Sequence, residues 1–166
     1  MRMLLPFVVL TTLSIACNKD DDNPNAVNSS DKNFLIQTFQ AARAEIKAGG
    51  LALINSNSSV VQNFSQRVIT DYRSMQSDIK AVADKINFAL TDTVALTIQS
   101  ANNVSGYSFD TAYIRSTARN QINLLSIFQN ETNTGNNTYV RHYFLNKYVD
   151  MIKAYYLEAD SIFRTL

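Results

Sequence analysis

The chain has few of the residues on which most metal, redox and phosphate sites depend. Its 166 residues include one Cys, one His, four Gly, two Pro and no Trp. A single Cys excludes an internal disulfide and a thiolate metal cluster, and a single His excludes the usual multi-histidine sites. Four glycines also leave little material for a glycine-rich loop that cradles phosphates. These absences remove several classes of enzyme before any motif is considered.

Charge is also scarce, and its two signs are balanced. Only 17% of the residues are charged, and fifteen Lys and Arg against fourteen Asp and Glu leave a formal net charge of +1. Nucleic-acid binding needs a basic excess that neutralises phosphates, so no nucleic-acid partner is expected. The hydrophobic fraction of 46% can support a buried core, and the length suits one domain.

Residues 1–16 have the pattern of an export signal. Arg2 supplies one positive charge, and residues 3–15 are apolar or small. That run is shorter than the roughly 20 apolar residues that span a bilayer. Residues 13–17 (Leu-Ser-Ile-Ala-Cys) then resemble the lipobox of bacterial lipoproteins, which implies that Cys17 is lipidated and becomes the mature N-terminus. The alternative is an ordinary cleaved signal peptide, in which Cys17 is only a small apolar residue.

Residues 17–30 are interpreted as the lipidated Cys followed by a flexible acidic tether. Residues 18–25 are polar and acidic and contain nothing that would build a core. Residues 17–22 also resemble the lysine-plus-acidic export signal of Bacteroidetes surface lipoproteins. That resemblance implies an outer-membrane location with the domain on the cell surface. If residues 17–22 are only a flexible spacer, the domain could equally lie on the periplasmic face of the membrane.

From Asp31 onward the apolar spacing is helical, which predicts an all-α domain over residues 31–166. Four segments carry apolar residues three and four positions apart, and such residues share one helix face. In the second segment, Asp71 or Tyr72 fills a gap in this pattern. The expected core positions are Leu35, Phe39, Ala42, Ile46, Gly49 and Leu53; Val61, Phe64, Val68, Met75, Ile79, Val82 and Ile86; Phe109, Tyr113, Asn120, Leu124 and Ile127; and Leu145, Tyr148, Ile152, Tyr155, Ala159, Ile162 and Leu166.

Two short links, around residues 55–58 and 132–137, predict two antiparallel helical hairpins. Ser30 or Asp31 is the expected cap of the first helix, residues 59–62 fit a capping box for the second, and residues 108–130 are the expected third helix. Residues 90–106 are the expected longer crossover, with a short helical turn allowed around residues 94–100. Four amphipathic helices bury their faces most simply as a bundle. The crossover favours a ferritin-like arrangement, and an up-down-up-down bundle remains the alternative.

The domain resembles the ferritin-like family described as domain of unknown function 4142. The resemblance covers residues 31–163 and is carried by Ala44–Gly49, Phe64–Tyr72, Phe109–Tyr113 and Ile127–Glu131. Such domains typically have a His after the helix-two Asp and further His residues inside helices three and four. Here the matching positions hold Tyr72, Asn120 and Tyr155, so a site built on those histidines cannot form in the same way. Glu45 and Asp71 remain from the polar set, and the resemblance implies a fold and export but no reaction.

Five polar side chains on or beside the predicted seams form the candidate site: Glu45, Asp71, Tyr72, Asn120 and Tyr155. They could line a pocket for a small ligand, or they could form a hydrogen-bonded core network, because buried polar groups are tolerated when paired. A di-iron centre needs carboxylates from four helices and two Glu-x-x-His motifs. The chain has three Glu, none followed by such a His, so no metal centre and no cofactor is expected.

The fourth helix is rich in tyrosine, which is enriched at protein interfaces. Its five residues of this type are Tyr139, Tyr143, Tyr148, Tyr155 and Tyr156, and a protein partner on this helix is one interpretation. His142 is expected at the surface, without a carboxylate that would orient it for catalysis. The resulting hypothesis is a non-enzymatic, lipid-anchored envelope lipoprotein that acts by binding or interaction. The alternative is a divergent ferritin-like metal-binding protein or enzyme that uses Glu45 and Asp71.

Overall fold

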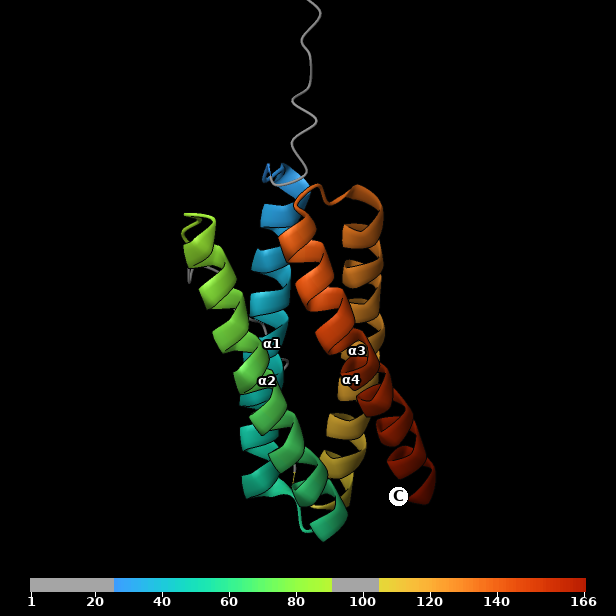
Figure 1. Ribbon diagram of the computed structural model, residues 1–166. Coiled ribbons are helices and arrows are strands. Elements are labelled where there is room, and N and C mark those ends of the chain that lie inside the picture. Colours follow the sequence, from blue (N-terminus) through green and yellow to red (C-terminus); the bar gives the residue numbers. More distant parts are fainter. Residues whose placement is uncertain (1–25, 91–104) are drawn as a thin grey trace, which may run out of the picture.

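A computed structural model describes residues 26–90 and 105–166, and every regular element in these two ranges is a helix. The four helices are α1 (Ser29–Asn55), α2 (Ser59–Lys85), α3 (Tyr107–Thr134) and α4 (Thr138–Thr165), and they pack as a bundle (Figure 1). The predicted all-α four-helix bundle is therefore confirmed. The predicted signal peptide, Cys17, most of the tether and the helical turn around residues 94–100 lie outside the described residues.

The two hairpins of the bundle are α1–α2 and α3–α4, each joined by a short link (Figure 1). α2 ends at one end of the bundle and α3 begins at the other, beside the α1–α2 link, where the Gly106 amide donates to the Asn55 carbonyl at 3.0 Å. α2 and α3 therefore run parallel. This is the arrangement that a crossover between hairpins produces, and it differs from an up-down-up-down bundle, in which consecutive helices are antiparallel.

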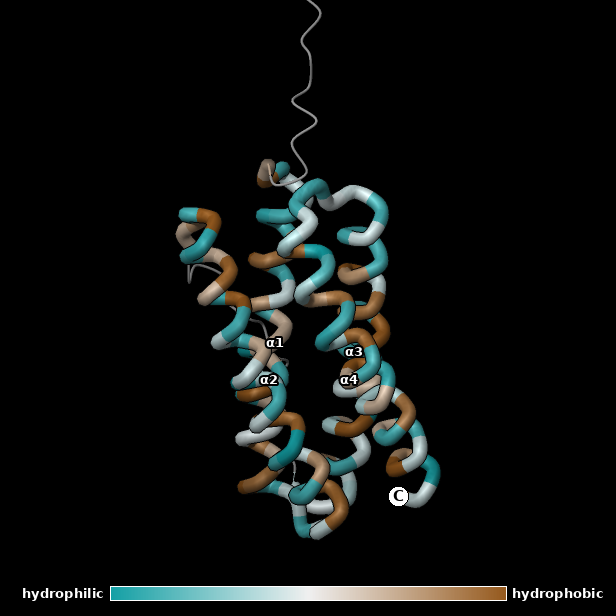
Figure 2. The backbone as a smooth tube through the Cα atoms, in the orientation of Figure 1, coloured by the Kyte–Doolittle hydropathy of each residue, from teal (hydrophilic) through white to brown (hydrophobic). Residues whose placement is uncertain are grey.

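The core follows the predicted seams over most of their length and departs from them at seven positions. The α2 seam is buried from Val61 to Val82, with Tyr72 rather than Asp71 in its gap. Apolar residues recur along every helix between hydrophilic ones, as expected of amphipathic helices (Figure 2). The expected core positions that are not buried are Ile46, Leu53, Ile86, Asn120, Ile127, Leu145 and Leu166.

Some of these departures have a geometric cause. Strict alternation of three and four residues gives a period of 3.5, whereas an α-helix has 3.6 residues per turn, so the buried face drifts by about 20° per heptad. Counting back from Tyr148, this drift buries Phe144 in place of Leu145. It does not account for Glu45, which is buried in place of Ile46 although the buried α1 residues keep the alternation of three and four. In α3, Gln121 is buried in place of Asn120.

The helix ends differ from the predicted ones by a few residues. Asn28 caps α1, because its side chain accepts from the Asp31 amide at 2.9 Å while the Asp31 carboxylate accepts from the Asn28 amide at 2.7 Å. Ser58 caps α2, and α3 runs from Tyr107 to Thr134 instead of residues 108–130. Runs of Asn, Ser and Asp offer several adjacent candidate caps, and only the backbone geometry selects which side chain reaches the third amide of the helix.

The adjacent Gly49 and Gly50 have different environments, which yields a matched prediction. A Cβ atom at Gly49 would lie 2.8 Å from Cγ1 of Ile69 and 3.3 Å from the Ser65 carbonyl, whereas a Cβ at Gly50 meets nothing within 4 Å. Gly49→Ala should therefore lower the free energy of unfolding by about 1–2 kcal/mol. Gly50→Ala should raise it by about 0.5–1 kcal/mol through helix propensity. Urea denaturation measures both changes, and changes of the same sign would contradict the close approach of α1 and α2.

Candidate functional site

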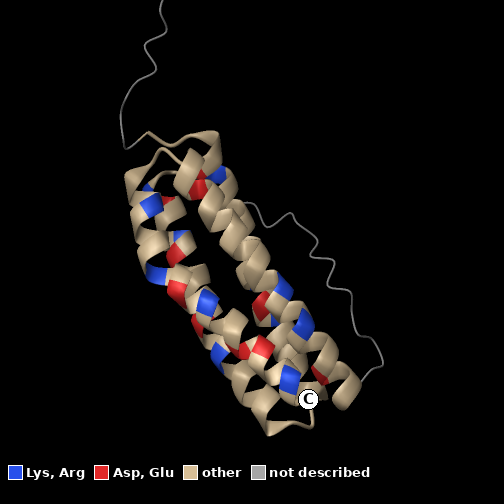
Figure 3. Ribbon diagram, turned by 90° about the vertical axis from the view of Figure 1, so that its right-hand side faces the viewer, with Lys and Arg blue, Asp and Glu red and all other residues tan. Residues whose placement is uncertain are grey.

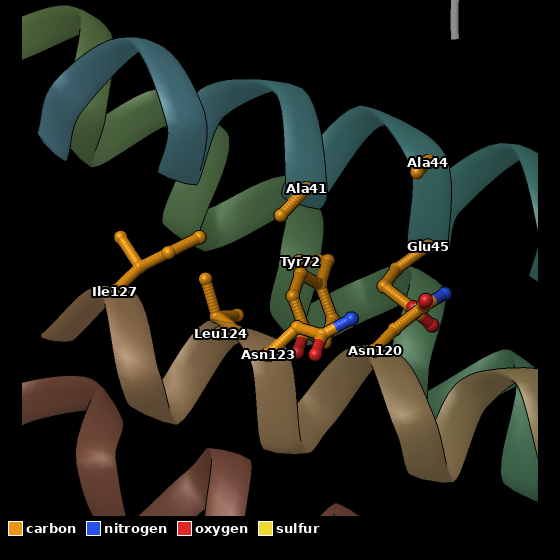
Figure 4. Close-up of a pocket in the computed structure, with 8 residues that line it drawn as sticks. All are labelled: Ala41, Ala44, Glu45, Tyr72, Asn120, Asn123, Leu124 and Ile127. Carbon is orange, nitrogen blue, oxygen red and sulfur yellow. The ribbon is translucent and has the colours of Figure 1, made fainter. Parts of the chain in front are cut away.

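A pocket of about 120 Å³ lies between α1 and α3, near the middle of the bundle. Its walls are mainly apolar, with a few amide, carboxyl and phenol groups among them. The lining residues are Ala41, Ala44, Glu45, Tyr72, Asn120, Asn123, Leu124 and Ile127. Figure 4 shows Glu45 of α1 and Asn120 of α3 pointing toward each other, with Tyr72 of α2 to one side of them.

Glu45 is the charged group of this pocket, and it is only 1% exposed. Its Oε1 accepts a hydrogen bond from Nδ2 of Asn120 at 2.8 Å, while its Oε2 is buried without a hydrogen-bond partner. Burial raises the pKa of the Glu45 carboxyl to about 7, against the opposing effect of the Asn120 hydrogen bond. The carboxyl is therefore divided between its protonated and ionised forms near neutral pH.

Tyr72 and Gln121 form a second buried polar pair beside Glu45. The Tyr72 hydroxyl donates to Oε1 of Gln121, and Nε2 of Gln121 is buried without a partner. Burial, reinforced by the charge of Glu45, raises the pKa of Tyr72 well above its usual value. Burial likewise raises the pKa of Tyr113 to about 12. Both phenols therefore stay protonated, and Tyr72 acts as a hydrogen-bond donor.

Asp71 and Tyr155 lie at a different seam, between α2 and α4. The Tyr155 hydroxyl donates to Oδ2 of Asp71 at 2.6 Å. Burial, followed by the hydrogen bond and charge of Asp71, raises the pKa of Tyr155 above its usual range. The structure thus divides the predicted five-residue cluster into Glu45 with Asn120, Tyr72 with Gln121, and Asp71 with Tyr155.

The Asp71–Tyr155 pair belongs to a ladder of polar contacts between the antiparallel helices α2 and α4. Lys147 Nζ lies 2.6 Å from Oδ2 of Asp78, which also accepts from the Tyr148 hydroxyl. Two further contacts join these helices. They are the Arg67–Glu158 ion pair and the cation–π contact of the Lys85 ammonium, which lies 3.8 Å from the centre of the Tyr139 ring. Hydroxyl and charged groups therefore pair along this seam and leave Asp71 no role in the pocket.

A family model described as "Domain of unknown function (DUF4142)" matches residues 17–162. The chain belongs to the DUF4142 family. No curated protein and no solved structure matches this DUF4142 chain. The family description assigns no activity.

Two buried acids, Asp31 and Glu131, lie side by side in this DUF4142 bundle. They lie at the end of the bundle that is opposite the α1–α2 link. The Asp31 carboxylate accepts from the Asn137 amide, at 3.1 Å to Oδ1 and 3.2 Å to Oδ2, in addition to the Asn28 amide. Glu131 is fully buried beside it and accepts from the Ser30 hydroxyl at 3.3 Å. Burial, followed by the hydrogen bond and charge of Asp31, raises the pKa of Glu131 to about 8. The pair joins three helix ends, so its role is structural.

The remaining candidate groups are spread over the DUF4142 bundle. His142 is exposed near the start of α4. Of the tyrosines in α4, Tyr148 and Tyr155 are buried, whereas the rings of Tyr139 and Tyr143 stack 5.8 Å apart at the surface, where a protein partner stays a prediction. Basic and acidic residues are interspersed along the face in Figure 3. Within residues 26–90 and 105–166, no group of three or more His, Cys, Asp or Glu could hold a metal ion.

Several residues of the site were missed by the sequence analysis. Gln121 was missed because the expected seam continued through Asn120, one position away. Asn123 at the pocket mouth lies off that seam, and Asp31 was considered only as a helix cap. The available signal was the i, i+4 series Tyr113, Thr117 and Gln121, which marks the buried face of α3 once the helical drift is allowed for.

Proposed function

We propose that this DUF4142 protein is a non-enzymatic, lipid-anchored envelope lipoprotein whose helical bundle binds a small ligand in the pocket between α1 and α3. The observation that carries the proposal is Glu45, a buried carboxyl with one unpartnered oxygen at a pocket wall. Burying such a group lowers stability, and an apolar residue of similar size would pack without that cost. Costly polar groups of this kind are concentrated at functional sites.

The chemistry of the lining supports binding rather than catalysis. Glu45 is the only group of the pocket that titrates near neutral pH, since Tyr72 stays protonated and Asn120 and Asn123 do not ionise. Nucleophilic catalysis would require a general base beside the nucleophile, and the pocket holds no second group that ionises near neutral pH. A carboxyl, a phenol and two amides set in an apolar wall instead resemble a recognition site, where a few polar groups orient a ligand.

A metal site built on Glu45 and Asp71 has less support. Glu45 pairs with Asn120 across the α1–α3 seam, whereas Asp71 pairs with Tyr155 across the α2–α4 seam. Hard metal ions need several oxygen ligands around one point. The parallel course of α2 and α3 supports a ferritin-like arrangement of the helices, and this arrangement does not by itself imply metal chemistry.

The pocket is tested by filling it. Ala44 lines the pocket, so Ala44→Leu should abolish the binding of small-molecule fragments that shift the NMR signals of pocket residues in the wild-type protein. Ala154→Leu is the matched control, because Ala154 is exposed on α4, and it should retain the same fragments. The proposed binding function is wrong if no fragment shifts pocket signals, or if the fragments bind Ala44→Leu equally well.

The anchor is tested at Cys17. Cys17→Ser should move the protein from the membrane fraction to the soluble fraction, because two or three acyl chains give stable anchoring whereas the bare chain lacks them. None of the described helices is long and apolar enough to cross a bilayer. Immunoblots of fractionated cells measure the change, with Ser14→Ala as a control that keeps the Cys. Protease treatment of intact cells then tests surface exposure, and unchanged fractionation of Cys17→Ser would contradict lipidation.

A further inference from the structure

We propose that the ligand of the α1–α3 pocket is a small primary amine, whose ammonium group donates to Oε2 of Glu45 while its short hydrocarbon chain lies against Ala41, Leu124 and Ile127. The inference rests on the proposed binding function and names the chemical class of the ligand. It starts from the one buried acceptor of the pocket that has no donor, Oε2 of Glu45.

The charge around Glu45 favours a cationic ligand. Its hydrogen-bond partner is the neutral amide of Asn120. The titratable groups that face it are Tyr72 of α2 and Tyr113 of α3, two phenols that carry no positive charge. No basic side chain contributes to the pKa of Glu45. A buried carboxylate in these surroundings is stabilised either by a proton or by a cation brought from outside.

The volume and the walls favour an organic cation over a metal ion. A cavity of about 150 Å³ holds benzene, so the 120 Å³ here suits an amine of about five heavy atoms. Ala41, Leu124 and Ile127 offer only apolar surface, and the ring of Tyr72 adds an aromatic wall that favours a nearby cation. A metal ion would find one carboxylate where it requires several oxygen ligands. A zwitterion would leave its own carboxylate without a cationic partner in the pocket.

The affinity of the pocket for an amine should depend on pH. An alkyl ammonium has a pKa of about 10.4 and stays charged between pH 6 and pH 8. The pKa of Glu45 is about 7, so the carboxyl is mostly protonated at pH 6 and mostly ionised at pH 8. Because the ammonium requires the ionised form, its affinity should rise roughly tenfold from pH 6 to pH 8. Above pH 8 the affinity should level off.

The test titrates the full-length purified protein with n-butylammonium by calorimetry at pH 6 and pH 8, and with n-butanol as the uncharged probe of the same size. We expect saturable binding of n-butylammonium, roughly tenfold tighter at pH 8 than at pH 6, and no saturable binding of n-butanol. Glu45→Gln should abolish this binding at both pH values. Asp150→Asn should leave it unchanged, because the Asp150 side chain is 95% exposed on α4. Circular dichroism confirms that both variants are folded.

The amine inference is wrong if n-butanol binds equally well, or if Glu45→Gln binds n-butylammonium as the wild type does. It is also wrong if binding is absent or does not change with pH. The fragment screen separates this failure from that of the proposed function. If neutral or anionic fragments bind the wild-type pocket and Ala44→Leu excludes them, only the amine inference is wrong. If no fragment binds there either, the proposed binding function fails as well.

Discussion

Asp31→Ala should lower the free energy of unfolding by about 3 kcal/mol, because it removes a buried carboxylate that joins two helix ends. The buried Asp31 carboxylate accepts from the amides of Asn28 and Asn137, and it thereby ties the start of α1 to the start of α4. Without it, both amides lose their acceptor and α1 loses its capping box. Each unsatisfied buried amide costs about 1–3 kcal/mol, and a lost cap about 1 kcal/mol. Relief of Glu131, whose pKa Asp31 raises, offsets part of this loss.

Urea denaturation of the purified protein measures the effect of Asp31→Ala. Asp150→Ala is the matched control, since it removes an exposed carboxylate from a helix and should change the free energy of unfolding by less than about 0.5 kcal/mol. A loss below about 1 kcal/mol for Asp31→Ala would mean that the three helix ends are joined by other contacts, such as the hydrogen bond from Asn28 Nδ2 to the Thr134 carbonyl at 2.9 Å.

Glu45→Gln should raise the free energy of unfolding above that of the wild type. This gain should be about 3 kcal/mol larger at pH 8 than at pH 4. The pKa of Glu45 rises from 4.5 to about 7 on folding, and a shift of this size corresponds to about 3 kcal/mol. The unfolded chain loses this proton near pH 4.5, whereas the folded protein holds it until about pH 7. Unfolding therefore releases a proton between these values, and the wild-type free energy of unfolding falls as pH rises through that window.

Gln cannot ionise, so Glu45→Gln escapes this loss. Chemical denaturation of both proteins at pH 4, 6 and 8 gives the difference directly, because the other titrating groups are common to both. The difference should be constant below about pH 4.5 and again above about pH 7. A difference that does not change with pH would show that Glu45 ionises freely in the folded protein, and it would remove the main observation behind the proposed function.

The predictions at Glu45 link stability to function. The same substitution should strengthen the fold at alkaline pH and abolish amine binding, so its two effects have opposite signs. Stabilising substitutions at binding sites often reduce function, because the site keeps groups that the fold alone would exclude. If Glu45 were present only for packing, its substitution would change stability without a loss of amine binding. The Asp31–Glu131 pair is the contrasting case, since its substitution should affect folding without affecting the pocket.

The amino-acid sequence determined the helical class, the two hairpins and most of the core. Apolar residues three and four apart can be buried together only on a helix, and the α2 seam from Val61 to Val82 was predicted almost completely for that reason. Gly135 and the polar residues around it marked the break between α3 and α4, which the structure places at residues 135–137. These features depend on local spacing, which a single sequence contains in full.

Only the tertiary structure decided which polar residues share a site. Glu45 and Gln121 lie in the core instead of Ile46 and Asn120, and which of two adjacent positions is buried depends on how four helices pack against one another. Glu45 meets Asn120 across 75 positions of sequence, and Asp31 meets Asn137 across 106. Residues so far apart come together through the relative placement of whole helices, which spacing within one helix does not encode.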